Sequence, residues 1–147
     1  MHEDDRAARE SFLAQVTLRA VEAGGVTEWA DVVEYSYNLT SSPLSSTLAR
    51  SPHGGDDARV VLVERNTEHL VRRQALEVTP TVIGKAFRQM HYSGRGELPL
   101  ECIPGGVSAA WREHVQDARR RNCSNDIDVT DADMLVQIGL FGKVRYY

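Results

Sequence analysis

Lysine is scarce in this sequence of 147 residues: Lys85 and Lys143 are the only two, and the other 15 basic residues are arginines. Because both residue types serve as solvated positive charge, we interpret the imbalance as a mutational bias. It indicates a bacterial genome of high GC content, or a phage or mobile element associated with one. Arginine also presents a planar guanidinium that suits phosphate and carboxylate groups, so these arginines are available for recognition surfaces.

Cysteine and long apolar runs are also rare. Cys102 and Cys123 are too few for a disulfide framework, and we expect both thiols to stay reduced. No apolar stretch approaches the length of a membrane span, and the acidic first ten residues lack the apolar segment of a signal peptide. These absences predict a cytoplasmic protein that has no membrane association.

Positive charge is not in excess, since the formal net charge is -4 and the isoelectric point is about 5.7. This balance excludes a protein whose whole surface attracts nucleic acid, although a local basic patch could still contact phosphate. Hydrophobic residues make up 41% of the sequence, which is enough for a core. The length fits one domain.

The N-terminal half predicts a helix, a strand and a loop. Residues 5–23 carry apolar side chains at helical spacing, with Arg9 and Arg19 on the opposite, outward face. Residues 29–33 could also start a helix, but we favour a strand at 32–39, where Val33, Tyr35, Tyr37 and Leu39 alternate in one register. Residues 40–57 are rich in Ser, Pro and Gly, which predicts a long mobile loop.

The segment at 59–78 has two interpretations. Residues 59–65 form a clear strand, and a β-hairpin would give this strand an immediate partner at 67–77. If 67–77 were helical instead, the helix at 79–91 would be the recognition helix of a helix-turn-helix DNA-binding regulator. Arg73 and Glu77 stand where that motif favours small residues or glycine, so we favour the hairpin.

The remaining sequence predicts three further helices. Thr79 and Pro80 start a helix near 80–91, whose apolar stripe we expect to pack on the sheet. Two more helices are predicted near 107–121 and 131–141, the last with Thr130 as its N-cap. "KVRYY" would then be a closing strand or a tail. The sequence thus predicts a single α+β domain with an N-terminal helix, a small antiparallel sheet and three C-terminal helices.

Exposed basic residues are the candidate contacts for a nucleic acid or an acidic partner. The six candidates are Lys85, Arg88, Arg95, Arg119, Arg120 and Arg121. Each also has a structural explanation, because solvated helix faces carry such residues and cations in a last helical turn favour the helix dipole. Any DNA contact would be weak and indifferent to sequence.

Metal and catalytic motifs are not evident, and we expect neither a metal nor another cofactor. His91, Cys102, His114 and Cys123 have no zinc spacing, and Asp131 and Gln137 replace the glycine and glutamate of a calcium loop. A small enzyme using Cys102 with a histidine is the weaker alternative. The leading hypothesis is a non-enzymatic accessory or regulatory protein that acts through a protein partner or through a weak nucleic-acid contact that is indifferent to sequence.

Overall fold

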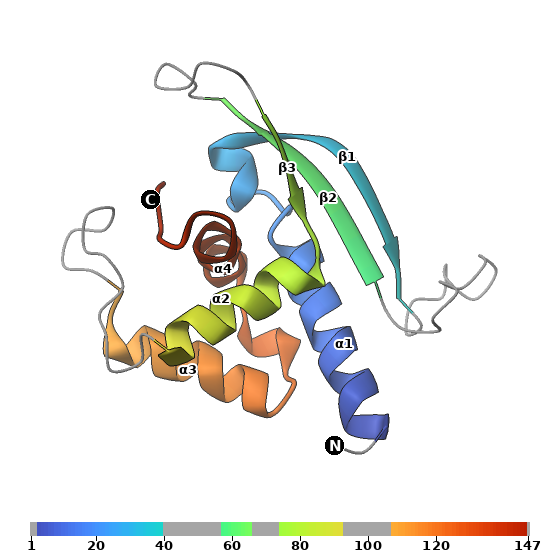
Figure 1. Ribbon diagram of the computed structural model, residues 1–147, viewed down its shortest axis with the longest axis vertical. Coiled ribbons are helices and arrows are strands. Elements are labelled where there is room, and N and C mark those ends of the chain that lie inside the picture. Colours follow the sequence, from blue (N-terminus) through green and yellow to red (C-terminus); the bar gives the residue numbers. More distant parts are fainter. Residues whose placement is uncertain (1–2, 40–56, 66–73, 93–106, 147) are drawn as a thin grey trace.

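The computed structural model describes residues 3–39, 57–65, 74–92 and 107–146 (Figure 1). These residues form one α+β domain with an N-terminal helix, a three-stranded antiparallel sheet and three further helices, as the sequence predicts. The elements are α1 (Glu3–Arg19), β1 (Ala30–Asn38), β2 (Asp57–Glu64), β3 (Ala75–Val78), α2 (Pro80–Tyr92), α3 (Ala109–Arg120) and α4 (Val129–Phe141). Two short 3-10 helices are η1 (Val26–Glu28) and η4 (Ser124–Asp126). The predicted loop at 40–57 lies outside the described residues, except for Asp57.

The sheet has the strand order β1-β2-β3, and both neighbouring pairs are antiparallel. β2 and β3 form the hairpin predicted at 59–78, in which Leu62 pairs with Leu76. Ala75–Val78 is therefore a strand and not the end of the first helix that a helix-turn-helix requires. Residues 66–73 lie outside the described part of the chain.

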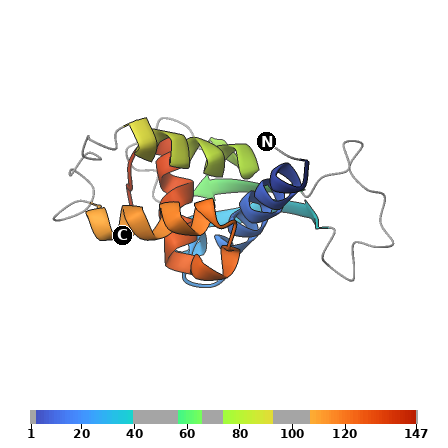
Figure 2. The ribbon, with the colours of Figure 1, turned by 90° about the horizontal axis from the view of Figure 1, so that it is seen from below.

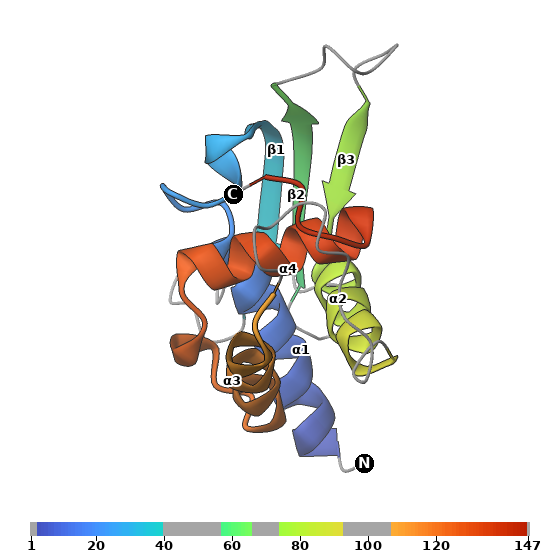
Figure 3. The ribbon, with the colours of Figure 1, turned by 90° about the vertical axis from the view of Figure 1, so that its left-hand side faces the viewer.

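Helices cover one face of the sheet, and Figure 3 shows α4 running across the strands on that side. The side chains of β2 alternate accordingly, and the buried ones on the covered face are Ala58, Val60, Leu62 and Glu64. The opposite face carries solvent-exposed ion pairs between Arg59 and both Glu34 and Glu77. Burial on one face and charge on the other fix the register of the strands.

α1 begins and ends earlier than the helix predicted at 5–23. It ends at Arg19, and Gly24 lies in the following turn with a φ of +91°. The buried residues of its inner face include Phe12, Val16 and Ala20, as the pattern predicts. The prediction that Arg19 faces outward is wrong: it is half-buried and donates hydrogen bonds to the carbonyl oxygens of Ser124 and Ile127, the latter at 2.8 Å.

α2 packs chiefly against α4 and α1, and its contacts with the strands are minor. This corrects the prediction that its apolar stripe packs on the sheet. The reason is the close approach of α4: a Cβ atom at Gly139 would collide with the carbonyl oxygen and side chain of Val82. Because Gly139 has no side chain, α4 reaches the apolar stripe of α2, which includes Ile83, Phe87 and Met90.

α4 starts two residues before the helix predicted at 131–141, and the prediction of Thr130 as its N-cap is wrong. The N-cap is Asp128, whose carboxylate accepts a hydrogen bond from the backbone N–H of Asp131 at 2.7 Å. The carboxylate of Asp131 accepts one from the N–H of Asp128 at 3.1 Å. This reciprocal capping box places Thr130 inside the first turn.

The C-terminal segment is a docked tail rather than a strand. α4 ends at Gly142, which adopts the left-handed conformation with a φ of +77°, and residues 143–146 follow without strand pairing. The fully buried Gln137 holds this tail: its side-chain oxygen accepts hydrogen bonds from the backbone N–H groups of Arg145 and Tyr146 at 2.7 and 2.6 Å. Its amide nitrogen donates to the carbonyl oxygen of Tyr146 at 2.9 Å.

Candidate binding surfaces

The basic residues singled out in the sequence fall into two environments. Lys85 and Arg88 are exposed on α2, Arg119 and Arg120 lie in the last turn of α3, and Arg121 is its C-cap. Arg95 lies outside the described residues. The surroundings of these side chains decide which of them could bind a ligand.

Arg120 and Arg121 are balanced by carboxylates. The guanidinium of Arg121 lies 2.9 Å from Asp117 and 2.6 Å from Asp126, and that of Arg120 lies 3.5 Å from Asp117. Hydrogen bonds from the guanidinium of Arg121 lower the pKa of the Asp117 carboxyl and the pKa of the Asp126 carboxyl below the ordinary value of an aspartate. The sequence places these arginines in one basic run, but the structure gives each an acidic neighbour.

Arg119 has a different environment. Its side chain is half-buried, and its guanidinium carbon lies 5.7 Å from the centroid of the Phe87 ring. Burial lowers the pKa of Arg119, and the positive charges of Arg9 and Arg88 lower it further. Burial and like charge therefore both disfavour the protonated form of Arg119.

Arg9 is fixed at this junction by hydrogen bonds. Its Nε donates to the side-chain oxygen of Asn122 at 2.6 Å, and its Nη2 donates to the carbonyl oxygen of Arg119 at 3.0 Å. The last carbonyls of a helix lack partners within the helix, so Arg9 caps α3. The prediction that Arg9 lies on the outward, solvent-facing side of its helix is wrong. The Arg9 side chain is half-buried and joins α1 to the end of α3.

α2 and α3 also meet directly. The amide nitrogen of Gln116 donates to the carbonyl oxygen of Phe87 at 3.4 Å. Figure 2 shows the two helices running one above the other, with α1 near one end of the pair. Arg88 and Arg119 therefore come from two helices that are held together.

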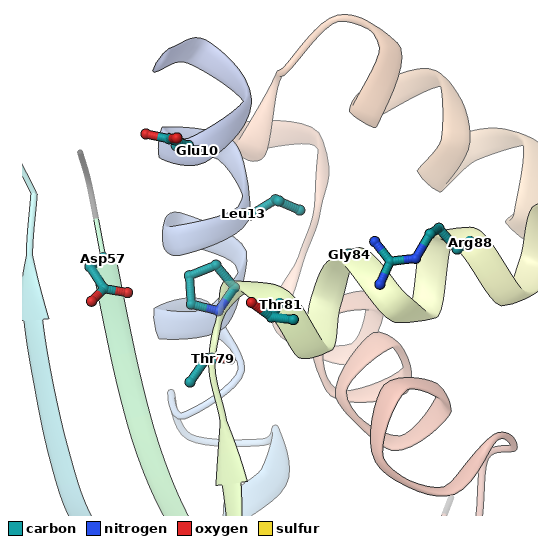
Figure 4. A pocket seen from close by; sticks show the side chains of 8 residues that line it. Glu10, Leu13, Asp57, Thr79, Thr81, Gly84 and Arg88 are labelled. Carbon is teal, nitrogen blue, oxygen red and sulfur yellow. The ribbon is translucent and has the colours of Figure 1, made fainter. Parts of the chain in front are cut away.

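A surface pocket of about 470 Å³ adjoins Arg88 (Figure 4). Its lining residues are Glu10, Leu13, Asp57, Thr79, Pro80, Thr81, Gly84 and Arg88. Figure 4 shows the guanidinium of Arg88 lying back along α2 toward Gly84. The carboxylate of Glu10 forms an ion pair with the guanidinium of Arg6 at 3.1 Å. The pocket is open, and its polar lining consists of two carboxylates, two threonine hydroxyls and one guanidinium.

The second surface is β1, an edge strand whose main contacts are with β2 and η1. Among the described residues, the large hydrophobic side chains that are exposed all lie on this strand: Val33 at 59%, Tyr35 at 51% and Tyr37 at 38%. The rings of Tyr35 and Tyr37 lie 5.5 Å apart. An apolar strip along an open strand edge is typical of a docking site.

A β-bulge at Val33 sets the direction of these side chains. The register shifts between Val32 and Glu34, so Val33 has no partner on β2, while Tyr35 pairs with Val60 and Tyr37 with Ala58. Directly paired residues share a face of the sheet, so both tyrosines lie on the face that the helices cover over β2. At β1 the two rings remain exposed, because no helix in the described ranges packs against this strand as α1 packs against β2.

The candidate catalytic and metal residues do not converge in the described part of the chain. Cys123 is a free, half-buried thiol, and the exposed His114 lies 3.5 Å from the carboxylate of Asp131. Cys102 and the side chain of His91 lie outside the described residues. Within the ranges that the structure describes, no group of three or more His, Cys, Asp or Glu side chains is arranged to hold a metal ion.

None of the helices in the described ranges combines the length and the apolar character that crossing a bilayer requires.

The sequence signals for the two candidate surfaces were unequal. Tyr35 and Tyr37 stood out by their alternation, whereas nothing local marked Arg9 as a neighbour of Arg119.

Comparison of the chain with protein-family models, with curated proteins and with solved structures gave no significant match.

Proposed function

We propose that this protein is a non-enzymatic accessory or regulatory protein that docks a protein partner along the edge of β1. The observation that carries the proposal is the exposure of Val33, Tyr35 and Tyr37 on one open edge strand. Their apolar surface would gain free energy when covered, at roughly 25 cal/mol per Å². The setting that we propose is the cytoplasm of a bacterium with a high-GC genome, or a phage or mobile element of such a host.

The partner that fits this edge is another polypeptide in extended conformation. An edge strand presents backbone N–H and C=O groups in the spacing of a β-ladder, which only another backbone matches along its length. β1 contains Asp31 and Glu34 and has no basic residue, which disfavours a phosphate-rich ligand. The favoured partner segment is therefore neutral or basic and places apolar side chains against Tyr35 and Tyr37.

The experiment is a quantitative capture of partners from an extract of the source cells, with the wild-type protein and two variants as baits. Val33→Lys/Tyr35→Lys puts charge on the strip and blocks strand addition. Ala7→Lys/Asn125→Lys adds the same charge at exposed positions on other elements. A partner retained by wild type and control is then purified, and its dissociation constant for all three proteins is measured.

We expect the β1 variant to bind that partner at least about tenfold more weakly, and the control to change affinity by less than about twofold. Matching far-ultraviolet circular dichroism spectra and melting temperatures establish that both variants fold. A partner that binds the β1 variant as tightly as wild type would overturn the proposal. Equal losses with both variants would also overturn it, because they would trace binding to net charge.

A further inference from the structure

Gly84 lies inside α2 at a position where the packing of the fold does not require glycine. A glycine within a helix lowers the stability of that helix relative to alanine. A Cβ atom at Gly84 would lie 3.6 Å from Nη1 of Arg88 and 3.9 Å from Cδ1 of Leu13, which are ordinary contact distances. At Gly139, by contrast, a Cβ atom would collide with Val82. Close packing therefore accounts for Gly139 but leaves Gly84 unexplained.

The missing side chain at Gly84 leaves space in the surface pocket of about 470 Å³, which Gly84 lines together with Arg88 (Figure 4). The guanidinium of Arg88 lies back along α2 toward this glycine. A longer side chain at Gly84 would extend into the pocket and compete with the guanidinium for the same space. The volume is within the range of about 300 to 1,000 Å³ that is usual for small-molecule sites.

The pocket carries charges of both signs, and two of them are not balanced by another described side chain. The guanidinium of Arg88, on α2, makes no ion pair or hydrogen bond with any other described residue. The carboxylate of Asp57, at the start of β2, accepts a hydrogen bond from the backbone N–H of Ala58 at 2.9 Å and pairs with no described cation. Glu10 differs, because it forms an ion pair with Arg6. One cation and one carboxylate thus remain for a ligand.

We propose that this pocket binds a small amino acid, whose carboxylate pairs with Arg88 and whose ammonium group pairs with Asp57. The planar guanidinium matches the two oxygens of a carboxylate, and an ammonium group supplies three donors to a carboxylate partner. A ligand with negative charge alone would also face the carboxylates of Asp57 and Glu10, which repel it. Leu13 and Pro80 offer apolar contact to the carbon chain between the two charged groups.

The test is a nuclear magnetic resonance titration of the isotope-labelled full chain with linear amino acids from 3-aminopropanoate to 8-aminooctanoate, at neutral pH and one fixed ionic strength. The series varies the distance between the ammonium group and the carboxylate, so the tightest member reports the span of the site. Hexylamine and hexanoate each carry only one of the two charges and serve as the comparison probes.

Three variants test the residues of the pocket, and two serve as matched controls. Arg88→Gln removes the cation, and Asp57→Asn removes the carboxylate charge but keeps a side-chain oxygen for the backbone bond that Asp57 accepts. Gly84→Met fills the pocket with a flexible side chain. The controls are Lys85→Gln and Glu22→Gln, which remove the same charges from exposed positions outside the lining.

We expect the tightest amino acid to bind the wild type at least about tenfold more tightly than hexylamine or hexanoate does. Each pocket variant should weaken that binding at least about tenfold, and each control by less than about twofold. Melting temperatures establish that the variants fold, and the two charge variants decide the matter if Gly84→Met does not. The β1 variant Val33→Lys/Tyr35→Lys should bind the amino acid unchanged, because no residue of β1 lines the pocket.

Three results would overturn the proposal. The first is the absence of saturable binding of every amino acid in the series to the wild type. The second is equally tight binding of a probe with a single charge, which would show that the two charges do not act together. The third is an equal loss of affinity in the pocket variants and the controls, which would place the binding outside this pocket.

Discussion

The two ends of β1 both carry aromatic residues, but only one end is enclosed. Directly before the strand, Trp29 is buried, its ring stacks on Tyr146 at 4.9 Å, and it meets Phe141 edge-on at 5.8 Å. Toward the end of the strand, Tyr35 and Tyr37 contact each other and are exposed. The difference shows that distant segments, α4 and the C-terminal tail, decide which aromatic residues belong to the core.

Hydrogen bonds reinforce the enclosed end. The indole N–H of Trp29 donates to Asp133 at 2.7 Å, and Gln137 donates to the same carboxylate oxygen at 3.2 Å. The hydroxyl of Tyr146 donates to the buried carboxylate of Glu64, which the guanidinium of Arg145 also contacts at 3.4 Å. Satisfied polar groups of this kind give a buried cluster one defined arrangement.

Replacing Trp29 with Ala is expected to have the largest effect on stability. The change removes a buried ring that touches both α4 and the tail, and it leaves the carboxylate of Asp133 without its indole donor. We expect the free energy of unfolding to fall by about 3 to 5 kcal/mol, as for other buried large-to-small changes. Urea unfolding followed by circular dichroism measures this loss.

The control for this prediction is Phe141→Ala, because Phe141 contacts the same ring but is only half-buried. We expect a smaller loss of about 2 to 3 kcal/mol. If Trp29→Ala costs less than about 1 kcal/mol, the end of β1 near η1 is not part of the core, and the contrast between the two ends fails.

Asp133→Asn tests the polar part of the enclosed end and should have a smaller effect. The side-chain oxygen of Asn can accept both hydrogen bonds, so we expect a change of less than about 1 kcal/mol at neutral pH. Burial raises the pKa of the Asp133 carboxyl above its ordinary value of 3.8, and the bonds from Trp29 and Gln137 offset this only in part. The native state therefore binds a proton more tightly than the unfolded state does.

That direction determines the pH dependence. A raised pKa in the folded state makes the contribution of Asp133 most favourable below the unfolded value, and this contribution is lost as pH rises through the folded pKa. Relative to wild type, Asp133→Asn should therefore gain stability as pH rises through this range. Urea titrations of both proteins at several pH values from about 3 to 7 measure the difference. If the difference in free energy of unfolding between the two proteins does not change with pH, the pKa of Asp133 is the same in the folded and unfolded states, and burial does not raise it.

Local sequence patterns were sufficient for the elements and for the hairpin. Apolar spacing identified α1, α2 and α3, Pro80 marked the start of α2, and β-prone residues identified β2. The choice of the hairpin over the helix-turn-helix rested on Arg73 and Glu77, and pairing of Leu62 with Leu76 confirms it. These features depend on residues close together in the chain, which is why one sequence reveals them.

The failures concern contacts between distant residues. The partner of α2 depends on Gly139, whose missing side chain lets α4 approach Val82. The N-cap of α4 depends on a reciprocal bond between Asp128 and Asp131, and Thr130 was an equally plausible cap by residue type.

The candidate sites were predicted less well than the fold, for the same reason. The basic run at Arg119–Arg121 looks uniform, yet Asp117 and Asp126 balance two of its members. The role of Arg9 depends on Arg119 and Asn122, which lie more than a hundred residues away in sequence. The β-bulge at Val33 leaves no local pattern, although it decides which face Tyr35 and Tyr37 share.

The smallest expected effect is at the open end of β1, in the variant Tyr35→Thr/Tyr37→Thr. Threonine keeps the preference for a strand, and the two rings contact each other and are exposed. We therefore expect the free energy of unfolding to change by no more than about 0.5 kcal/mol, against the several kcal/mol expected for Trp29→Ala. Urea unfolding under the conditions used for Trp29→Ala gives the comparison directly. A loss above about 2 kcal/mol would show that these rings support the core, and exposure of Tyr35 and Tyr37 could then no longer be attributed to a docking surface.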